Sequence, residues 1–172
     1  RFHHAKRKPE AEMGLKDWFG LEGKRALVTG ASRGLGREMA LALAEAGADI
    51  IITGRTQETL DATVADIRAL GRQAWGVMAD MSEAVQCEAA CKAILREYGP
   101  VDILINNVGN RIASMPIVEE TLETWQQSLD MNLTSCFLGT RIFGAAMLER
   151  GQGGRIINIA SMSGLIANRG IG

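Results

Sequence analysis

The stretch "LVTGASRGLGREMA", residues 27–40, joins an apolar run to an amphipathic pattern through three glycines. Gly30 ends the apolar run, and Gly34 and Gly36 follow within six residues. A sharp turn from a strand into a helix requires positive φ angles, which glycine adopts at little cost. Glycine also lets backbone N–H groups approach a phosphate, which the positive end of a helix dipole attracts. The stretch predicts a pyrophosphate-binding turn, with a tight turn that holds no ligand as the alternative.

On either side of this turn, short β-rich runs alternate with helical patterns. The expected strands cover residues 25–29, 49–53, 73–79, 102–106 and 155–160, and the expected helices cover 34–47, 57–70, about 82–98 and about 119–149. The apolar faces of the first two helices are expected to hold Leu35, Met39 and Leu43, and then Leu60, Val64, Ile67 and Leu70. Strands that are apolar throughout favour a parallel sheet with helices on both faces. The expected fold is therefore α/β, a Rossmann-type doubly wound parallel sheet over residues 14–172 that is truncated after its fifth strand.

The composition excludes several classes of protein. The 172 residues suffice for one domain, and a formal net charge of −1 does not indicate a general affinity for nucleic acid or acidic membranes. No apolar run approaches the ~20 residues of a membrane span. Residues 1–13 show no hydrophobic period and no secretory signal, so we interpret them as a disordered tail or an upstream leader. His3 and His4 lie in that tail, where fraying is favoured over metal binding.

Three cysteines occur, an odd number with no zinc-type pair of CxxC motifs. Cys87 and Cys91 are four residues apart on an expected helix and therefore share a face, whereas Cys136 lies on the long helix. We interpret the pair as small helix residues of a cytoplasmic protein in a reducing environment.

The end of the second expected strand reports on the type of dinucleotide. NAD-binding sites place an acidic residue about 20 residues after the glycines, where it bonds the ribose 2′-hydroxyl. Here the strand ends "IITGRT", with Gly54 and Arg55 and no acid, and Arg33 lies within the glycine turn. Arginine matches the geometry of a phosphate group, so the pattern predicts NADP(H) over NAD(H). Two solvated arginines are the alternative.

Five motifs occur in an order that resembles the short-chain dehydrogenases/reductases. They are "TGASRGLG" (29–36), "AD" (79–80), "NNVG" (106–109), "MN" (131–132) and "GRIINIAS" (154–161), and the resemblance runs from about residue 21 to residue 172. The opening "LKDWFGLEGKRALVTGASRGLG" looks most like the gluconate 5-dehydrogenase and 3-oxoacyl-carrier-protein reductase branch. The resemblance implies an oxidoreductase that transfers hydride between its cofactor and a carbonyl/alcohol substrate, of the sugar-acid or 3-oxoacyl type.

The motifs and the resemblance together give a set of expected cofactor-binding residues. The set is Gly30, Ser32, Arg33, Gly34, Leu35, Gly36, Arg55, Asp80, Met81, Asn107 and Gly109. In the family, the residue matching Asp80 accepts a hydrogen bond from the adenine amino group, although a helix N-cap would also explain this residue. Asn107 and Gly109 match a motif that steadies the sheet and lines the adenosine-side ribose, in which Val108 replaces the usual alanine.

Two residues match the catalytic positions of the family. Asn132 corresponds to an asparagine that holds a water in a proton relay. Ser161, preferred here over Ser163, corresponds to a serine that hydrogen-bonds the substrate carbonyl at the end of the fifth strand. Arg111, in the loop 110–116, is a candidate for binding a substrate carboxylate, with a solvated loop arginine as the alternative.

The resemblance also implies a Tyr-x-x-x-Lys helix just after the serine, which this sequence lacks. Its one tyrosine is Tyr98 and its last lysine is Lys92, both ahead of the fourth strand. We therefore expect the protein to continue beyond Gly172 and the chain alone to be inactive, with a non-catalytic dinucleotide-binding fragment as the alternative function. Asn132 and Ser161 disfavour a Rossmann epimerase or methyltransferase.

The second half of the long helix, residues 133–148, is apolar nearly all round. In the family, the long helix and the Tyr/Lys helix form much of the subunit interface. The sequence therefore predicts a homo-oligomer through the 119–149 helix, and association or aggregation where that face and one sheet edge stay uncovered.

Overall fold

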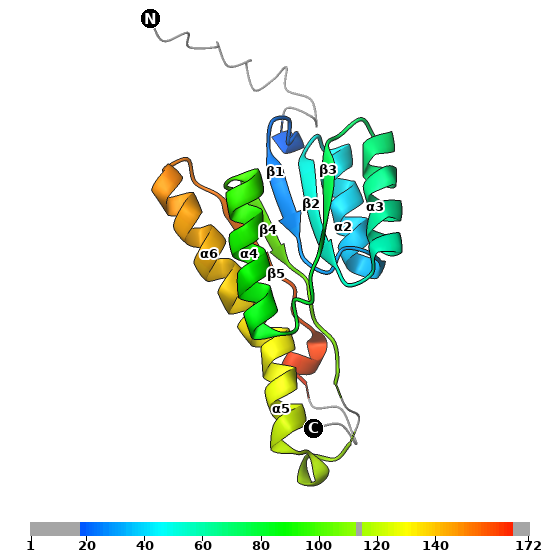
Figure 1. The fold of residues 1–172 in the computed structure, drawn as a ribbon, viewed down its shortest axis with the longest axis vertical. Helices are drawn as coiled ribbons and strands as arrows, with labels where there is room; N and C mark the ends of the chain where they lie inside the picture. Colours follow the sequence, from blue (N-terminus) through cyan, green and yellow to red (C-terminus); the bar gives the residue numbers. More distant parts are fainter. Residues whose placement is uncertain (1–17, 113–114, 167–172) are drawn as a thin grey trace, which may run out of the picture.

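A computed structural model describes residues 18–112 and 115–166, which form a parallel sheet between two layers of helices (Figure 1). The five strands lie in the order β3-β2-β1-β4-β5. Their bounds are β1 Arg25–Val28, β2 Asp49–Gly54, β3 Ala74–Met78, β4 Ile103–Asn106 and β5 Arg155–Asn158. The helices α2 (Gly34–Glu45) and α3 (Gln57–Ala69) cover one face, and α4 (Ala84–Tyr98) and α6 (Ser135–Arg150) cover the other (Figure 1). The predicted doubly wound sheet is confirmed.

The central strand β1 is buried on both faces, which explains why its sequence is apolar without alternation. Ala26 and Val28 belong to the core beneath α2 and α3, whereas Leu27 belongs to the core beneath α4 and α6. Leu27 lies beside Ile51 of β2 and Leu104 of β4 in the parallel register. Both sets of side chains are removed from water, as parallel sheets require.

Helix α2 does not bury the face that its large apolar residues predicted. Leu35 is 74% exposed, and Met39 only packs at the margin of the core. The buried row is instead Gly36, Ala40 and Ala44. Small side chains let the helix axis lie close to the sheet, which holds the first turn of α2 against the end of β1. The small side chains of α2 therefore form its buried face. The expectation that Leu35 belongs to the packed face of this helix was wrong.

The predicted α3 face is largely confirmed, and so is the expectation that Cys87 and Cys91 share one face of a helix. Leu60, Val64 and Ile67 are buried, whereas Leu70 is exposed because it is the C-cap residue of α3. Cys87 and Cys91 are free thiols buried on one face of α4. The hydrogen bond with Cys87 and burial both raise the pKa of the Cys91 thiol.

The helix expected over about 119–149 begins later and changes its winding. It consists of α5 (Leu122–Leu129), a π-helical segment η3 (Asp130–Thr134) and α6, after a short 3₁₀ turn η2 (Ile117–Glu119). The late start follows from Thr121, whose hydroxyl accepts a hydrogen bond from the Thr124 N–H and completes a capping box. Figure 1 shows α5 extending beyond the carboxyl ends of the strands. Within residues 18–112 and 115–166, no helix combines the length and apolarity needed to cross a bilayer.

Candidate functional site: a dinucleotide cradle at the carboxyl ends of the strands

The turn between β1 and α2 has the backbone geometry expected of a phosphate cradle. Gly30 and Gly34 have φ angles of 64° and 58°, in the left-handed region that favours glycine. Arg33 is the N-cap residue of α2 and makes no side-chain hydrogen bond to the first turn. The first N–H groups of the helix are therefore available to an anion, and the helix dipole favours one there.

The segment after β4 holds this turn in place. The side-chain amide of Asn107 donates to the carbonyl oxygens of Thr29 at 2.9 Å and Gly30 at 3.2 Å. In return, the Thr29 hydroxyl oxygen accepts from the backbone N–H groups of Asn107 at 2.9 Å and Val108 at 3.2 Å. Both amide hydrogens of Asn107 are therefore used in hydrogen bonds to the turn. Asn107 influences a ligand indirectly, because it holds the turn in place.

Two glycines allow close approach at the cradle. A Cβ atom at position 36 would lie 2.5 Å from Asn107 Nδ2 and 2.6 Å from the Gly30 carbonyl oxygen. A Cβ atom at position 109 would lie 3.0 Å from Asn132 Oδ1. The start of α2 therefore meets the glycine turn without space for a side chain, and the segment after β4 meets Asn132 of η3 just as closely.

Asp80 and Arg55 form an ion pair beside the cradle. Asp80 Oδ1 accepts hydrogen bonds from the Ser82 N–H at 3.0 Å and the Ser82 hydroxyl at 2.6 Å, and Oδ2 lies 3.8 Å from Arg55 Nη1. Burial on its own raises the pKa of Asp80, but the Ser82 hydrogen bonds and the Arg55 charge outweigh it, so the pKa lies below its usual value. Glu83 is the N-cap residue of α4, so the N-cap alternative for Asp80 is wrong.

The remaining expected cofactor residues divide by exposure. Arg33 and Leu35 are exposed on the first turn of α2, and Arg55 is 61% exposed after β2. Ser32 is half-buried, and its carbonyl oxygen accepts a hydrogen bond from the Thr63 hydroxyl at 3.3 Å. The Met81 side chain is buried in the core under α4, so only its main chain is placed to meet a ligand.

An open groove of about 820 Å³ begins at Arg55 and Asp80 and extends to α5. Its acidic lining residues are Asp80, Glu83, Glu123 and Asp130, and its other lining residues from α5 and its neighbours are Ile112, Leu122, Gln126, Gln127 and Met131. The residues expected at the adenosine end of a dinucleotide therefore border a cavity of ligand size.

Asn132 lies in the π-helical segment η3, a type of segment that is frequent at functional sites. Its side-chain amide donates to the carbonyl oxygens of Asn110 and Ser128, each at 2.9 Å. Its Oδ1 accepts from the Asn110 N–H at 3.0 Å. These bonds fasten the segment after β4 to the long helix. The exposed Arg111 follows directly, and residues 113 and 114 of the expected substrate loop lie outside the described residues.

Ser161 lies past the carboxyl end of β5, at the same end of the parallel strands as the cradle. It is exposed and is the N-cap residue of a short 3₁₀ helix η4 (Met162–Gly164), where its hydroxyl oxygen accepts from the Ser163 N–H at 3.2 Å. Tyr98 lies at the opposite end of the strands, where its carbonyl oxygen accepts from Arg25 at the start of β1. The only described tyrosine is therefore remote from Ser161.

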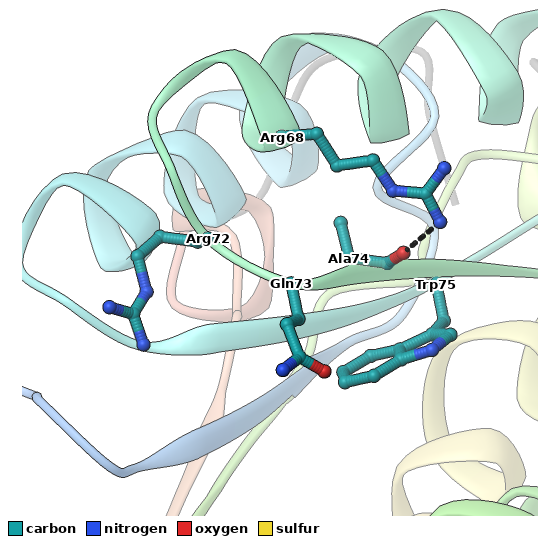
Figure 2. Close-up of a pocket in the computed structure, with 5 residues that line it drawn as sticks. All are labelled: Arg68, Arg72, Gln73, Ala74 and Trp75. Carbon is teal, nitrogen blue, oxygen red and sulfur yellow. Dashed lines mark hydrogen bonds between the residues drawn. The ribbon is translucent and has the colours of Figure 1, made fainter.

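A smaller pocket of about 230 Å³ lies at the amino end of β3 (Figure 2). Arg68 donates to the Ala74 carbonyl oxygen at 2.8 Å, and Arg72 bonds Asp49 at 2.9 Å. Figure 2 shows the two arginines pointing away from each other, with Trp75 on the other side of the strand. These side chains do not converge on one ligand, and they lie at the opposite end of the sheet from the glycine turn.

Two threonines at the cradle were missed by the sequence analysis. The Thr29 hydroxyl joins the turn to the segment after β4, and the Thr53 hydroxyl oxygen accepts from the Gly30 N–H at 3.1 Å. Thr29 directly follows β1 and Thr53 is the last residue but one of β2, and each is buried next to a glycine. A buried hydroxyl needs a hydrogen-bond partner, so this position is the signal by which they are recognisable.

The order of motifs and their geometry agree with the comparison to known families. The family model described as "short chain dehydrogenase" matches residues 24–171. The chain belongs to this family. The predicted membership in the short-chain dehydrogenases/reductases is therefore confirmed.

Individual relatives support the same assignment. The chain is 39% identical over 146 residues to a 3-oxoacyl-[acyl-carrier-protein] reductase of Synechocystis sp., covering 84% of this chain and 58% of the relative. It is 36% identical over 159 residues to a gluconate 5-dehydrogenase of Gluconobacter oxydans, covering 92% and 61%. The crystal structure of a short-chain type dehydrogenase/reductase from Mycobacterium marinum matches with a TM-score of 0.82 and 37% identity, covering 91% of this chain and 63% of that one. The chain thus spans about three fifths of the length of these relatives.

Proposed function

We propose that the chain is the dinucleotide-binding part of an NADP(H)-dependent oxidoreductase that acts on a carbonyl/alcohol pair. The observation that carries the proposal is the glycine turn, held by Asn107 at the start of α2, with no room for a Cβ atom at Gly36. This cradle fits a pyrophosphate, which would bind the first N–H groups of α2. The nicotinamide of the bound cofactor would supply the hydride.

The preference for NADP(H) is proposed on Arg33 and Arg55. Both guanidinium groups are exposed beside the cradle, and no acidic residue occupies the end of β2. A charge-assisted hydrogen bond contributes about 1.5–3 kcal/mol, so two of them give a preference of about a hundredfold or more.

The double variant Arg33→Ala/Arg55→Asp tests this preference in a fluorescence titration with each reduced cofactor. We expect NADPH affinity to fall by about a hundredfold and NADH affinity to change little, because NADH carries no 2′-phosphate. Unchanged NADPH affinity would remove the argument for NADP(H).

We further propose that Ser161 positions the substrate carbonyl and that Asn132 fixes the segment carrying Asn110 beside it. Ser161 follows the carboxyl end of β5, and Asn132 in η3 bonds Asn110 in the segment after β4, which supports these roles. The relatives are named for a 3-oxoacyl and a sugar-acid substrate, and Arg111 would suit the carboxylate of the latter. Assays of a longer protein that contains this chain, with sugar acids and with acyl thioester ketones, distinguish the two substrate classes.

A non-catalytic dinucleotide-binding fragment is the second candidate function for these residues alone. It is favoured by Tyr98, the one tyrosine, which lies at the wrong end of the strands to donate a proton at Ser161. We expect the 172-residue chain to bind NADPH without oxidising it in the presence of a carbonyl substrate. Measurable turnover by the purified chain would exclude this candidate.

The assembly and cellular location are also proposals. Leu133, Phe137 and Leu148 are exposed on the long helix, which supports a homo-oligomer formed through residues 119–149. The free thiols Cys87 and Cys91 in the core fit a reducing compartment such as the cytoplasm.

A further inference from the structure

The two carboxylate oxygens of Asp80 have different surroundings. Oδ1 accepts two hydrogen bonds from Ser82, one from the backbone N–H at 3.0 Å and one from the hydroxyl at 2.6 Å. These bonds fix the orientation of a side chain that is only 30% exposed. Oδ2 is therefore held toward the groove, where Arg55 Nη1 lies 3.8 Å away.

Arg55 is the more exposed member of this pair and is held by fewer contacts than Asp80. Its side chain is 61% exposed, and among the described residues its one ion pair is with Asp80. It is also the only cationic side chain that the described residues contribute to the lining of the groove. A dianionic phosphate entering beside Arg55 therefore meets a guanidinium group that a fixed carboxylate already attracts.

We propose that Asp80 is a specificity-determining residue, which competes with the 2′-phosphate for Arg55 and so weakens the preference for NADP(H) over NAD(H). This inference rests on the proposed function, since it assumes that the adenosine end of a dinucleotide binds at Arg55 and Asp80. NADH carries no 2′-phosphate and leaves the ion pair in place. NADPH must share Arg55 with Asp80, so its phosphate gains less from Arg55 than it would if Asp80 carried no charge.

The size of the effect follows from the exposure of the pair. Ion pairs with one largely exposed partner are weak, so removing the Asp80 charge should change the affinity ratio about two- to fivefold. Asp80→Asn is the appropriate variant because its amide oxygen still accepts from Ser82 and only the charge is lost.

The test measures a preference ratio, the dissociation constant of NADH divided by that of NADPH, by fluorescence titration of the 172-residue chain. A higher ratio means a stronger preference for NADPH. Four proteins form a double-mutant cycle: the parent chain, Asp80→Asn, Arg55→Gln and the double variant. We expect Asp80→Asn to raise the ratio about two- to fivefold in the parent and to leave it unchanged in the Arg55→Gln background. Asp61→Asn removes the same charge from the exposed face of α3, outside the groove, and should leave the ratio at the parent value.

Three results overturn the proposal. They are an unchanged or lowered ratio in Asp80→Asn, the same rise when residue 55 is glutamine, and an equal rise in Asp61→Asn. If Arg55→Gln lowers the ratio while Asp80→Asn does not raise it, the proposed NADP(H) preference stands and only this inference fails. A parent chain that binds neither cofactor contradicts the proposed function and this inference together.

Discussion

Gly36 lies where the first turn of α2, the glycine turn and the segment after β4 meet. One of the atoms a side chain there would strike is the backbone oxygen of Gly30, which cannot move without changing the cradle itself. The missing Cβ atom is thus a requirement of both the fold and the proposed pyrophosphate site. At this position, the stability of the chain and its ligand affinity should change together.

We predict that Gly36→Ala lowers the free energy of unfolding by about 1–3 kcal/mol, as overpacking does, and weakens NADPH binding at least tenfold. Gly144→Ala is the matched control. Gly144 lies inside α6, and a Cβ atom there would make an ordinary 3.5 Å contact with Ile156 of β5. Urea unfolding and cofactor titration measure the two effects. If Gly36→Ala and Gly144→Ala change stability and NADPH affinity equally, the structure around Gly36 accommodates a Cβ atom and the prediction is wrong.

Asp80 gives a prediction about acid stability. Burial opposes its ionisation, but the Ser82 hydrogen bonds and Arg55 prevail, so the pKa of Asp80 is lower in the folded chain than its ordinary value of 3.8. A carboxyl group with a lowered pKa stabilises the fold fully above its unfolded pKa and loses that contribution as pH falls through the folded pKa. The parent chain should therefore exceed Asp80→Asn in unfolding free energy above about pH 5, and the difference should shrink toward pH 3. Urea unfolding between these pH values measures it, and a difference independent of pH would refute the assigned cause.

At the scale of elements, α2 shows which part of a helix pattern was readable from sequence. Its position between β1 and β2 was predicted correctly from the glycines and the alternation of elements. Its buried face was not, because Leu35 and Met39 outweigh Ala40 and Ala44 in apolar surface. The face was decided by how closely the helix must approach the sheet, which depends on residues far away in the sequence.

The close packing of α2 predicts a position-specific response to larger side chains. Ala40 is fully buried against the sheet, whereas Ala42 is exposed on the same helix. We expect Ala40→Leu to lower the free energy of unfolding by about 1–3 kcal/mol and Ala42→Leu to change it by less than about 0.5 kcal/mol. Thermal or urea unfolding compares the two. A small effect at position 40 would show that α2 can move away from the sheet at little cost.

At the scale of the whole molecule, the strand order explains which site residues could be assigned in advance. The glycine turn and Arg55 are readable because they follow a strand directly, where the chain itself sets their place. The bonds from Asn107 to Thr29 and Gly30 join residues more than 70 positions apart, and they exist because β4 lies beside β1. The contacts of Asn132 with Asn110 likewise depend on how the long helix crosses the strand ends, which local sequence does not determine.

The same strand order leaves β5 at the margin of the described sheet. Ile105 of β4 and Ile157 of β5 are register partners on the face covered by α2, yet Ile105 is 4% exposed and Ile157 is 46% exposed. Within residues 18–112 and 115–166, β5 pairs with β4 alone. Backbone groups at an unpaired edge and apolar side chains beside it favour association between chains.

We therefore predict that the 172-residue chain self-associates at high micromolar concentration and that Ile157→Lys raises the dissociation constant about tenfold or more. Val85→Lys is the control, because Val85 is an apolar residue on α4, away from β5, and is even more exposed than Ile157. Phe137→Lys reports separately on the exposed face of α6. Size-exclusion chromatography with light scattering measures the mass over a dilution series. A monomeric parent chain, or equal effects of Ile157→Lys and Val85→Lys, would show that the β5 margin does not drive association, whereas an effect of Phe137→Lys alone would assign it to α6.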